Sequence, residues 1–173
     1  GPADLLAQVE ADRLDAAFGA FAQKRSGLSQ LEIAPATLML VHGEPFAGIG
    51  PRIAWPQVFE HPLVALTEAS PVQQLVNGMA REVGADLRPR MVVHQLETAL
   101  GLVERGFGVA VFPSFARAAW RRFQVRASEI EPPASIGYYR VAKAGKEAGD
   151  ALDGFTQLMI RRMRHAVPFE DAA

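Results

Sequence analysis

The loop at residues 67–70, with the sequence TEAS, carries side chains suited to holding a small anion. It joins a predicted strand to a predicted helix, for which Ser70 is a common N-cap and Pro71 a common first residue. Gln73 completes an S-x-x-Q capping box. A helix N-terminus presents unpaired N–H groups and a partial positive charge, which suit a carboxylate or phosphate. Because Pro71 has no N–H group, Val72 and Gln73 would supply the donors; the alternative is that Ser70 is only a helix cap.

A second set of polar side chains follows the next predicted strand along the chain. His94 and Gln95 stand at its carboxyl end, and Thr67 holds the same place after the preceding strand. The carboxyl ends of parallel strands share one edge of a sheet, where open α/β sheets bind ligands. We therefore expect these groups to face one crevice. For His94 the alternative is an ordinary exposed or hydrogen-bonded histidine.

Motifs for metal binding, nucleotide binding and catalysis are not found in the sequence. There is no cysteine, and the four histidines show no i, i+3 or i, i+4 pairing with one another, so we predict no metal and no cofactor. Gly106-Phe107-Gly108 leaves a predicted helix and enters a strand, the reverse of a phosphate-binding loop. No catalytic residue is predicted, and an enzyme would need Ser70 and His94 to converge as nucleophile and base.

The elements that position these residues form a strand–helix series between residues 63 and 113. Leu63–Thr67 is an apolar strand, and a helix runs from Pro71 to about Val83. Arg90–His94 is a β-prone run, and the helix Leu96–Arg105 is followed by Gly106, which suits positive φ at a helix end. The apolar run Val109–Phe112 closes the series as a buried strand. Three strands joined through helices predict a parallel, right-handed arrangement.

Shorter patterns predict the elements on both sides of this series. Gly, Pro and polar residues at 42–51 indicate a connector, and Trp55-Pro56 starts a turn or short helix to Glu60. Other predictions are an amphipathic helix at 3–11, a strand at 14–21, extended chain at 31–41 and 124–126, a helical piece at 114–123, a strand at 135–142 and an amphipathic helix at 150–165.

The composition excludes several classes of protein. With 173 residues and a net charge of −1, the chain can bury a core but lacks the basic face typical of nucleic-acid binding. The basic residues at 117–126 are more typical of a solvated helix face than of a binding site. No apolar run reaches the length of a membrane helix, and the acidic N-terminal segment does not match an export signal. We expect a cytoplasmic protein.

Five segments and a terminal helix carry a family resemblance. In order, the segments are LLAQVEADRLDAAFGAF, LEIAPATLMLV, LVALTEASPVQQLV, HQLETALGLVERGFGVAVFPS and SIGYYRV. This ordered set resembles the effector-binding domain of LysR-type transcriptional regulators, and the resemblance covers nearly the whole chain.

The resemblance implies an α/β, two-lobed periplasmic-binding-protein-like fold with parallel-sheet lobes joined by two crossing strands. Residues 1–43 and 136–173 would form regulatory lobe I, which is incomplete, and residues 44–135 would form lobe II. A small effector, often a carboxylate or aromatic molecule, would bind in the cleft between the lobes. The effector-binding residues would be Thr67, Glu68, Ser70, Pro71, Val72, His94, Gln95, Leu96 and Ile136.

The resemblance also implies partners and a departure from the family pattern. The DNA-reading helix-turn-helix, its linker helix and the first strand–helix–strand of the regulatory domain are absent before Gly1. DNA binding would belong only to a full-length protein, and self-association through the regulatory domain would be weakened. Two alternatives remain open. One is a solute-binding protein of a transport system, which shares the two-lobe architecture, and the other is the small α/β enzyme described above.

Overall fold

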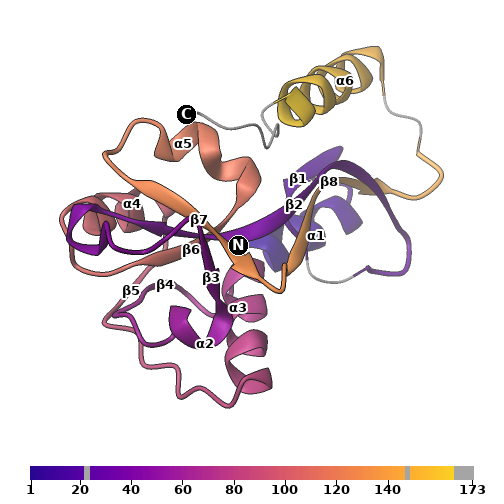
Figure 1. Cartoon of the computed structure of the whole chain (residues 1–173). Helices are drawn as coiled ribbons and strands as arrows, with labels where there is room; N and C mark the ends of the chain where they lie inside the picture. The colour runs from indigo at the N-terminus through magenta and orange to yellow at the C-terminus, as the bar shows by residue number, and fades with distance from the viewer. Residues whose placement is uncertain (22–23, 147–148, 166–173) are drawn as a thin grey trace. The chain divides into compact units, whose positions relative to one another are not determined.

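The computed structural model describes residues 1–21, 24–146 and 149–165 (Figure 1). By its internal contacts the chain divides into two compact units, Gly1–Ala36 with Gly137–Ala173, and Thr37–Ile136. Two strands, β2 (Leu28–His42) and β8 (Ser135–Lys143), contain residues of both units. The predicted assignment of 1–43 with 136–173 and of 44–135 as regulatory lobes stays a prediction, and its residues 166–173 lie outside the described part of the chain.

The first unit is a small sheet with a helix against each face. β1 (Ala16–Gly19) pairs antiparallel with β8, which neighbours β2. α1 (Pro2–Glu10) buries Leu6 and Val9 against Ala17 and Val141, which are direct partners across β1 and β8. Successive strand residues point to opposite faces, so Phe18 faces the other side, where its ring lies 5.2 Å from that of Phe155 in α6 (Asp150–His165).

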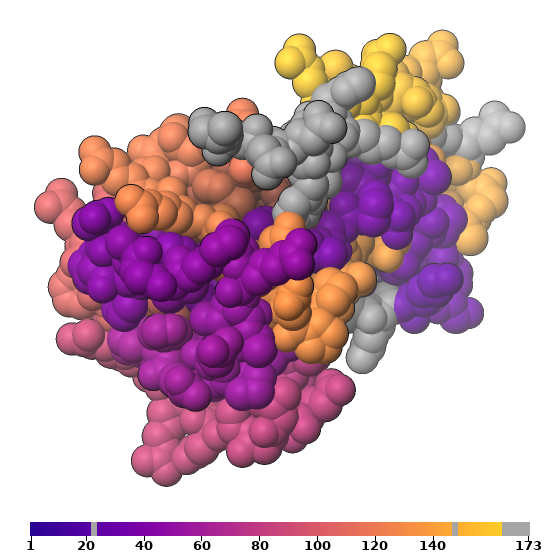
Figure 2. Space-filling view, in the orientation of Figure 1, coloured from indigo at the N-terminus to yellow at the C-terminus, as the bar shows by residue number. Residues whose placement is uncertain are grey.

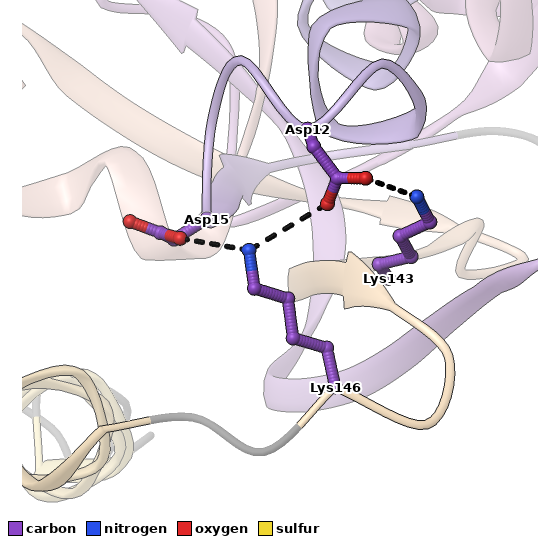
Figure 3. A network of polar contacts seen from close by, with 4 residues as sticks. All are labelled: Asp12, Asp15, Lys143 and Lys146. Atoms are coloured by element: carbon purple, nitrogen blue, oxygen red, sulfur yellow. Dashed lines mark hydrogen bonds and ion pairs between the residues drawn. The ribbon is translucent and has the colours of Figure 1, made fainter.

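Exposed ion pairs connect the segment after α1 with the end of β8 and the turn that follows it (Figure 3). Asp12, at a φ of 53°, pairs with Lys143 and lies 3.6 Å from the ammonium of Lys146. Lys146 is also 3.1 Å from Asp15. The hydrogen bond from Lys143 holds the pKa of Asp12 below its ordinary value, and the bond to Asp15 raises the pKa of Lys146. Surface charges therefore hold these two connections together.

The second unit contains the larger set of elements. In chain order after β2 they are η1 (Glu44–Phe46), β3 (Arg52–Ala54), α2 (Trp55–Val58), β4 (Val64–Leu66), α3 (Pro71–Glu82), β5 (Met91–Val93), α4 (Leu96–Glu104), β6 (Ala110–Pro113), η2 (Ser114–Ala116), α5 (Arg117–Trp120) and β7 (Arg126–Glu131).

Strand directions in the second unit agree with the predicted parallel series. β4 and β5 pair in parallel, and a parallel bridge between Leu63 and Val109 joins β4 to the chain leading into β6. β2 lies between β6 and β7 and runs antiparallel to both, while β3 pairs in parallel with β7. The carboxyl ends of β4, β5 and β6 therefore point the same way.

Both faces of this sheet are covered by helices, which explains the continuous apolar runs in its central strands. In β2, Leu38 and Leu40 belong to one core cluster and Met39 and Val41 to another, following the period of two along a strand. The first cluster contains residues of α2 and α3, and the second contains residues of α4 and α5. α2 and α3 are neighbours, and Figure 2 shows the segments around residues 40–60 and 70–90 adjoining on one face of this unit.

Two strands were not predicted from the sequence. β7 was expected only as the extended piece 124–126, because polar side chains interrupt its pattern, yet Ser128 and Ile130 point inward and are buried. β3 has three residues and lies between the predicted connector at 42–51 and the predicted helix start at Trp55, where no element was predicted. The other predicted elements are confirmed, with small shifts at their ends.

Candidate functional site

The candidate site is built on the paired ends of β4 and β5. Their register sets Leu66 opposite Val93, so the chain leaves both strands at the same level. The next residue after β4, Thr67, donates its backbone N–H to the carbonyl oxygen of Val93 at 3.1 Å. His94 is the next residue after β5 and is exposed. Thr67 and His94 thus follow adjacent strand ends, as the sequence predicted.

The start of α3 differs from the predicted capping box. Ser70 is the N-cap residue, but its side chain makes no capping hydrogen bond. Its backbone N–H is already engaged, because it donates to the carbonyl of Thr67 at 2.9 Å and closes a tight turn. The side-chain oxygen of Gln73 accepts instead from the N–H of Leu66 at 3.0 Å. The capping-box prediction is therefore wrong, because tertiary structure supplies both groups with other partners.

The buried side chain of Gln73 fixes the backbone that leads into the loop. Its side chain is 6% exposed, and besides Leu66 it contacts Asn77, donating through Nε2 to Oδ1 at 2.9 Å. A buried amide with partners at both ends is stabilising, and removal of one partner would leave a buried polar group unsatisfied. On the outer side, Gln74 donates to the carbonyl of Glu68 at 3.1 Å. Two consecutive glutamines thus fix the loop at residues 66–70.

The start of α4 repeats this arrangement beside the first. Gln95 is its N-cap residue in extended conformation, and its side chain makes no capping bond. The first helical hydrogen bond runs from the N–H of Ala99 to the carbonyl of Gln95, at 3.1 Å. The N–H groups of Leu96, Glu97 and Thr98 precede this bond and have no partner within the helix. Two helix N-termini without side-chain caps therefore follow adjacent strand ends.

The electrostatics of this edge favour a bound anion. Each helix start carries about half a positive charge on its free N–H groups, and the effect is concentrated in the first turn. Thr67 and Ser70 are partly buried and add hydroxyl groups, while Gln95 is exposed and adds an amide. Glu97 lies in the first turn of α4, where its carboxylate offsets part of this positive charge.

One further polar group, Ser114, lies near the same end of the strands and was not identified from the sequence. Ser114 follows β6 directly and is 5% exposed, and its Oγ accepts from the backbone N–H of Thr37 at 3.4 Å. Because β6 runs in the same direction as β4, Ser114 stands at a carboxyl end. In the sequence, the only indication of this position was a Pro-Ser pair directly after a buried strand. Ile136 packs on the core cluster that contains Val72.

A buried histidine lies in the second unit outside this edge. His42, 1% exposed, has its Nε2 3.1 Å from Oγ of Ser128, whose hydroxyl donates to the carbonyl of Gly50 at 2.6 Å. Ser128 must therefore accept from His42, which assigns the proton to Nε2. Burial lowers the pKa of His42 below its ordinary value, with smaller contributions in the same direction from Arg126 and His61. The lowered pKa favours the neutral imidazole, which joins β2 to β7 through Ser128.

The arrangement offers no metal site or catalytic pair in the part of the chain that is described. Residues 1–21, 24–146 and 149–165 contain no group of three potential metal ligands, and Ser70 and His94 share no hydrogen bond. No helix within these ranges is long and apolar enough to cross a membrane. The groups that do gather are hydrogen-bond donors beside helix N-termini, a combination suited to holding an anion.

A family model described as the LysR substrate binding domain matches residues 1–164. The chain belongs to this family. The resemblance inferred from the ordered segments is thereby confirmed, and the fold of this LysR substrate-binding domain is the α/β, periplasmic-binding-protein-like fold of the family. The family consists of regulator domains, which supports the regulatory interpretation over the transport and enzyme alternatives. No curated protein sequence matches the chain.

Solved structures agree with the fold. The effector-binding domain of QuiR in complex with shikimate matches with a TM-score of 0.77 at 15% identity, covering 94% of this chain and 78% of that one. The C-terminal domain of a probable LysR family regulator from Rhodococcus sp. RHA1 matches with a TM-score of 0.74 at 24% identity, covering 94% and 80%. An H2O2-bound OxyR mutant from Corynebacterium glutamicum gives 0.79 at 16% identity, covering 95% and 54%. This LysR domain thus spans about half the length of OxyR.

Proposed function

We propose that this chain is the effector-sensing domain of a LysR-type transcriptional regulator. Its effector is a small organic molecule, either a carboxylate or an aromatic compound. The observation that carries the proposal is the pair of uncapped helix starts, α3 and α4, at adjacent ends of parallel strands. Donors fixed by the fold lose little freedom on binding, so a carboxylate there gains charge-assisted hydrogen bonds at small entropic cost.

The proposed site assigns each residue a role. The hydroxyls of Thr67 and Ser70 and the amide of Gln95 bind carboxylate oxygens, together with the backbone N–H groups of Val72 and Leu96. Pro71 starts the helix without competing for the ligand, since it has no N–H group. His94 and Glu68, both exposed, distinguish ligands by their polar substituents. Ile136 contacts the apolar body of the effector.

Binding would control transcription by shifting the population of domain conformations. An effector that prefers one arrangement of the two units stabilises it by its difference in affinity. In this proposal the full-length protein acts in the cytoplasm, carries its DNA-binding module elsewhere, self-associates through its regulatory domains and catalyses no reaction. In this chain, effector binding changes the populated conformation, and that change controls the DNA-binding module.

The proposal is tested by calorimetric titration of this chain with a panel of aliphatic and aromatic carboxylic acids. Each acid is paired with its primary amide, which keeps the shape but removes the charge. We expect at least one acid to bind with a Kd between about 1 μM and 1 mM, and its amide to bind at least tenfold more weakly. Equal binding of acid and amide, or no heat from any acid, would refute the carboxylate site.

A further inference from the structure

A pocket of about 410 Å³ lies on the second unit, between the connector that precedes β3 and the helix that follows it. The connector forms the first wall and contributes Phe46 and Ile49. Both side chains are partly buried and pack on a core cluster of this unit, to which the buried Ile53 of β3 also belongs. The inner surface of the pocket is therefore apolar.

The second wall of the pocket is one face of α2 and of the turn after it. The N–H of His61 bonds to the carbonyl of Val58 at 3.3 Å, so the helical path continues past the end of α2. Residues three and four apart share a helix face, which sets Gln57, Glu60 and His61 side by side along the pocket. The other face of α2 buries Trp55 and Val58 in the core. The fold of the second unit thus fixes both walls.

The pocket and the candidate effector site belong to different edges of the sheet. β3 is parallel to β7, and both β7 and β6 are antiparallel to β2. Since a parallel bridge joins β4 to the chain leading into β6, β3 and β4 run in the same direction. Arg52 begins β3 and His61 precedes β4, whereas Thr67 follows β4. The pocket is lined by none of the residues assigned to the effector.

One carboxylate of the pocket has no countercharge. Glu60 is exposed and forms no ion pair with any residue in the described part of the chain. Arg52 also lines the pocket, but two carboxylates of β7 engage its guanidinium, Glu129 at 3.4 Å and Glu131 at 3.5 Å. Two carboxylates around one guanidinium leave an excess of negative charge, and Glu60 adds to it. At a pH where His61 is uncharged, the pocket therefore favours a cation.

The aromatic ring of Phe46 is a second feature suited to a cation. It lies 5.8 Å from the ring of His61, and the planes of the two rings meet at 80°. An aromatic ring attracts a cation placed within about 6 Å of its face, and it also packs against the apolar body of a ligand. Phe46 and Glu60 together suit a molecule that combines an ammonium group with an apolar body.

We propose that this pocket is a second small-molecule site, which binds an organic amine in its protonated form. The ammonium group pairs with Glu60, and the apolar body packs on Phe46 and Ile49. A cavity of about 410 Å³ lies within the range of small-molecule sites. Because exposed ion pairs are weak, apolar contact supplies most of the affinity, and charge supplies the selectivity. This site does not depend on the proposed effector site.

The test titrates the whole chain at pH 8 with 2-phenylethylamine and with its neutral analogue, 2-phenylethanol. Binding is followed by the NMR signals of the histidine rings. The sequence has four histidines, of which His61 lines this pocket and His94 belongs to the effector site. We expect the amine to move the His61 signals with a Kd of about 1–10 mM and to leave those of His94 in place. It should bind about three- to tenfold more tightly than the alcohol.

Two variants separate the charge of the pocket from charge elsewhere. Glu60→Gln keeps the shape of the side chain but removes its charge, so the amine and the alcohol should bind about equally. Glu82→Gln, in α3, removes the same charge outside the pocket and should keep the wild-type preference. Both positions are exposed, so both variants should keep the circular dichroism of the wild type.

Three results would overturn the proposal. One is that the His61 signals do not move at about 30 mM amine. Another is equal affinity of the wild type for the amine and the alcohol. The third is a preference for the amine that persists in Glu60→Gln. The organic acids of the effector test are expected to move the signals of His94, so the failure of one site is distinguished from the failure of the other.

Discussion

Different kinds of interaction stabilise the two units of this molecule internally. The second unit has apolar clusters on both faces of its sheet, containing fully buried residues such as Trp55, Phe112 and Leu100. The first unit has one small apolar cluster, and on its other face Arg140 bonds to Thr156 and Asp153. Apolar burial persists in salt, whereas exposed ion pairs do not. The strand ends that position the candidate site thus belong to the second unit, whose stability should depend least on salt concentration.

The largest effect is expected from removing a large buried side chain of the second unit. Trp55 is fully buried, stacks 5.9 Å from Phe59 and donates through Nε1 to the carbonyl of Pro132 at 2.9 Å. Trp55→Ala should lower the free energy of unfolding by about 3–5 kcal/mol in urea titrations. The control Val92→Ala, at an exposed position, should change it by no more than about 0.5 kcal/mol. Similar small effects from both would show that the second unit does not depend on its apolar clusters.

A pair of glycine substitutions tests how closely the second unit is packed. A Cβ on Gly108 would lie 2.2 Å from the carbonyl oxygen of Pro62, so Gly108→Ala must shift backbone and should destabilise the protein by about 1–3 kcal/mol. Gly78 lies inside α3 with nothing within 4 Å of such a Cβ, so Gly78→Ala should stabilise by about 0.5–1 kcal/mol. Thermal melts of both should move in opposite directions. Shifts of the same sign would contradict the packing described.

The pH dependence of the second unit should reveal its buried histidine. Folding lowers the pKa of His42, so the folded chain binds this proton less readily than the unfolded chain. The contribution of His42 to stability is therefore constant above the unfolded pKa of about 6.5 and decreases as the pH falls below it. Urea midpoints at pH 7.5 and 5.0 measure the decrease, which His42→Asn should reduce. An equal decrease in the variant would assign the effect to other groups.

The smallest effect is expected in the first unit. Asp12→Asn removes the negative charge between Lys143 and Lys146 and should slightly lower the melting temperature in dilute buffer. In 1 M salt the variant and the wild type should melt together, because the ion pairs are screened. Since the pKa of Asp12 is lowered, its contribution is present above pH 3.8 and is lost as the pH falls further. A difference that survives in salt would mean that packing, not charge, was changed.

Local patterns in the sequence predicted most of the fold and only part of the site. The run from Val109 to Phe112 identified β6, because a strand buried on both faces has an unbroken apolar sequence. β7 did not show this pattern, since its inward-facing Ser128 is polar and is buried only because His42 and Gly50 bond to it. Hydrogen-bond partners that are distant in the sequence cannot be recognised from a short local stretch of residues.

The same limit applies to the candidate site. The positions of Thr67 and His94 after their strands followed from periodicity, but the partner of Gln73 did not. Its side chain could satisfy either the N–H of Ser70 or that of Leu66, and the turn closed by Thr67 decides between them. Ser114 was missed because a lone serine after Pro113 is common in loops, and only the direction of β6 gives it significance.

The central claim is that backbone N–H groups at the start of α4 bind a carboxylate, and Leu96 tests it most directly. Leu96 is the first helical residue and follows Gln95 in extended conformation, so Leu96→Pro removes one N–H group without opposing the local backbone. Leu96→Ala keeps the N–H group but loses the same packing. Calorimetric titration with the tightest-binding acid should give wild-type affinity, within about threefold, for Leu96→Ala, and about tenfold weaker binding for Leu96→Pro. Equal affinities in the two variants would contradict the account.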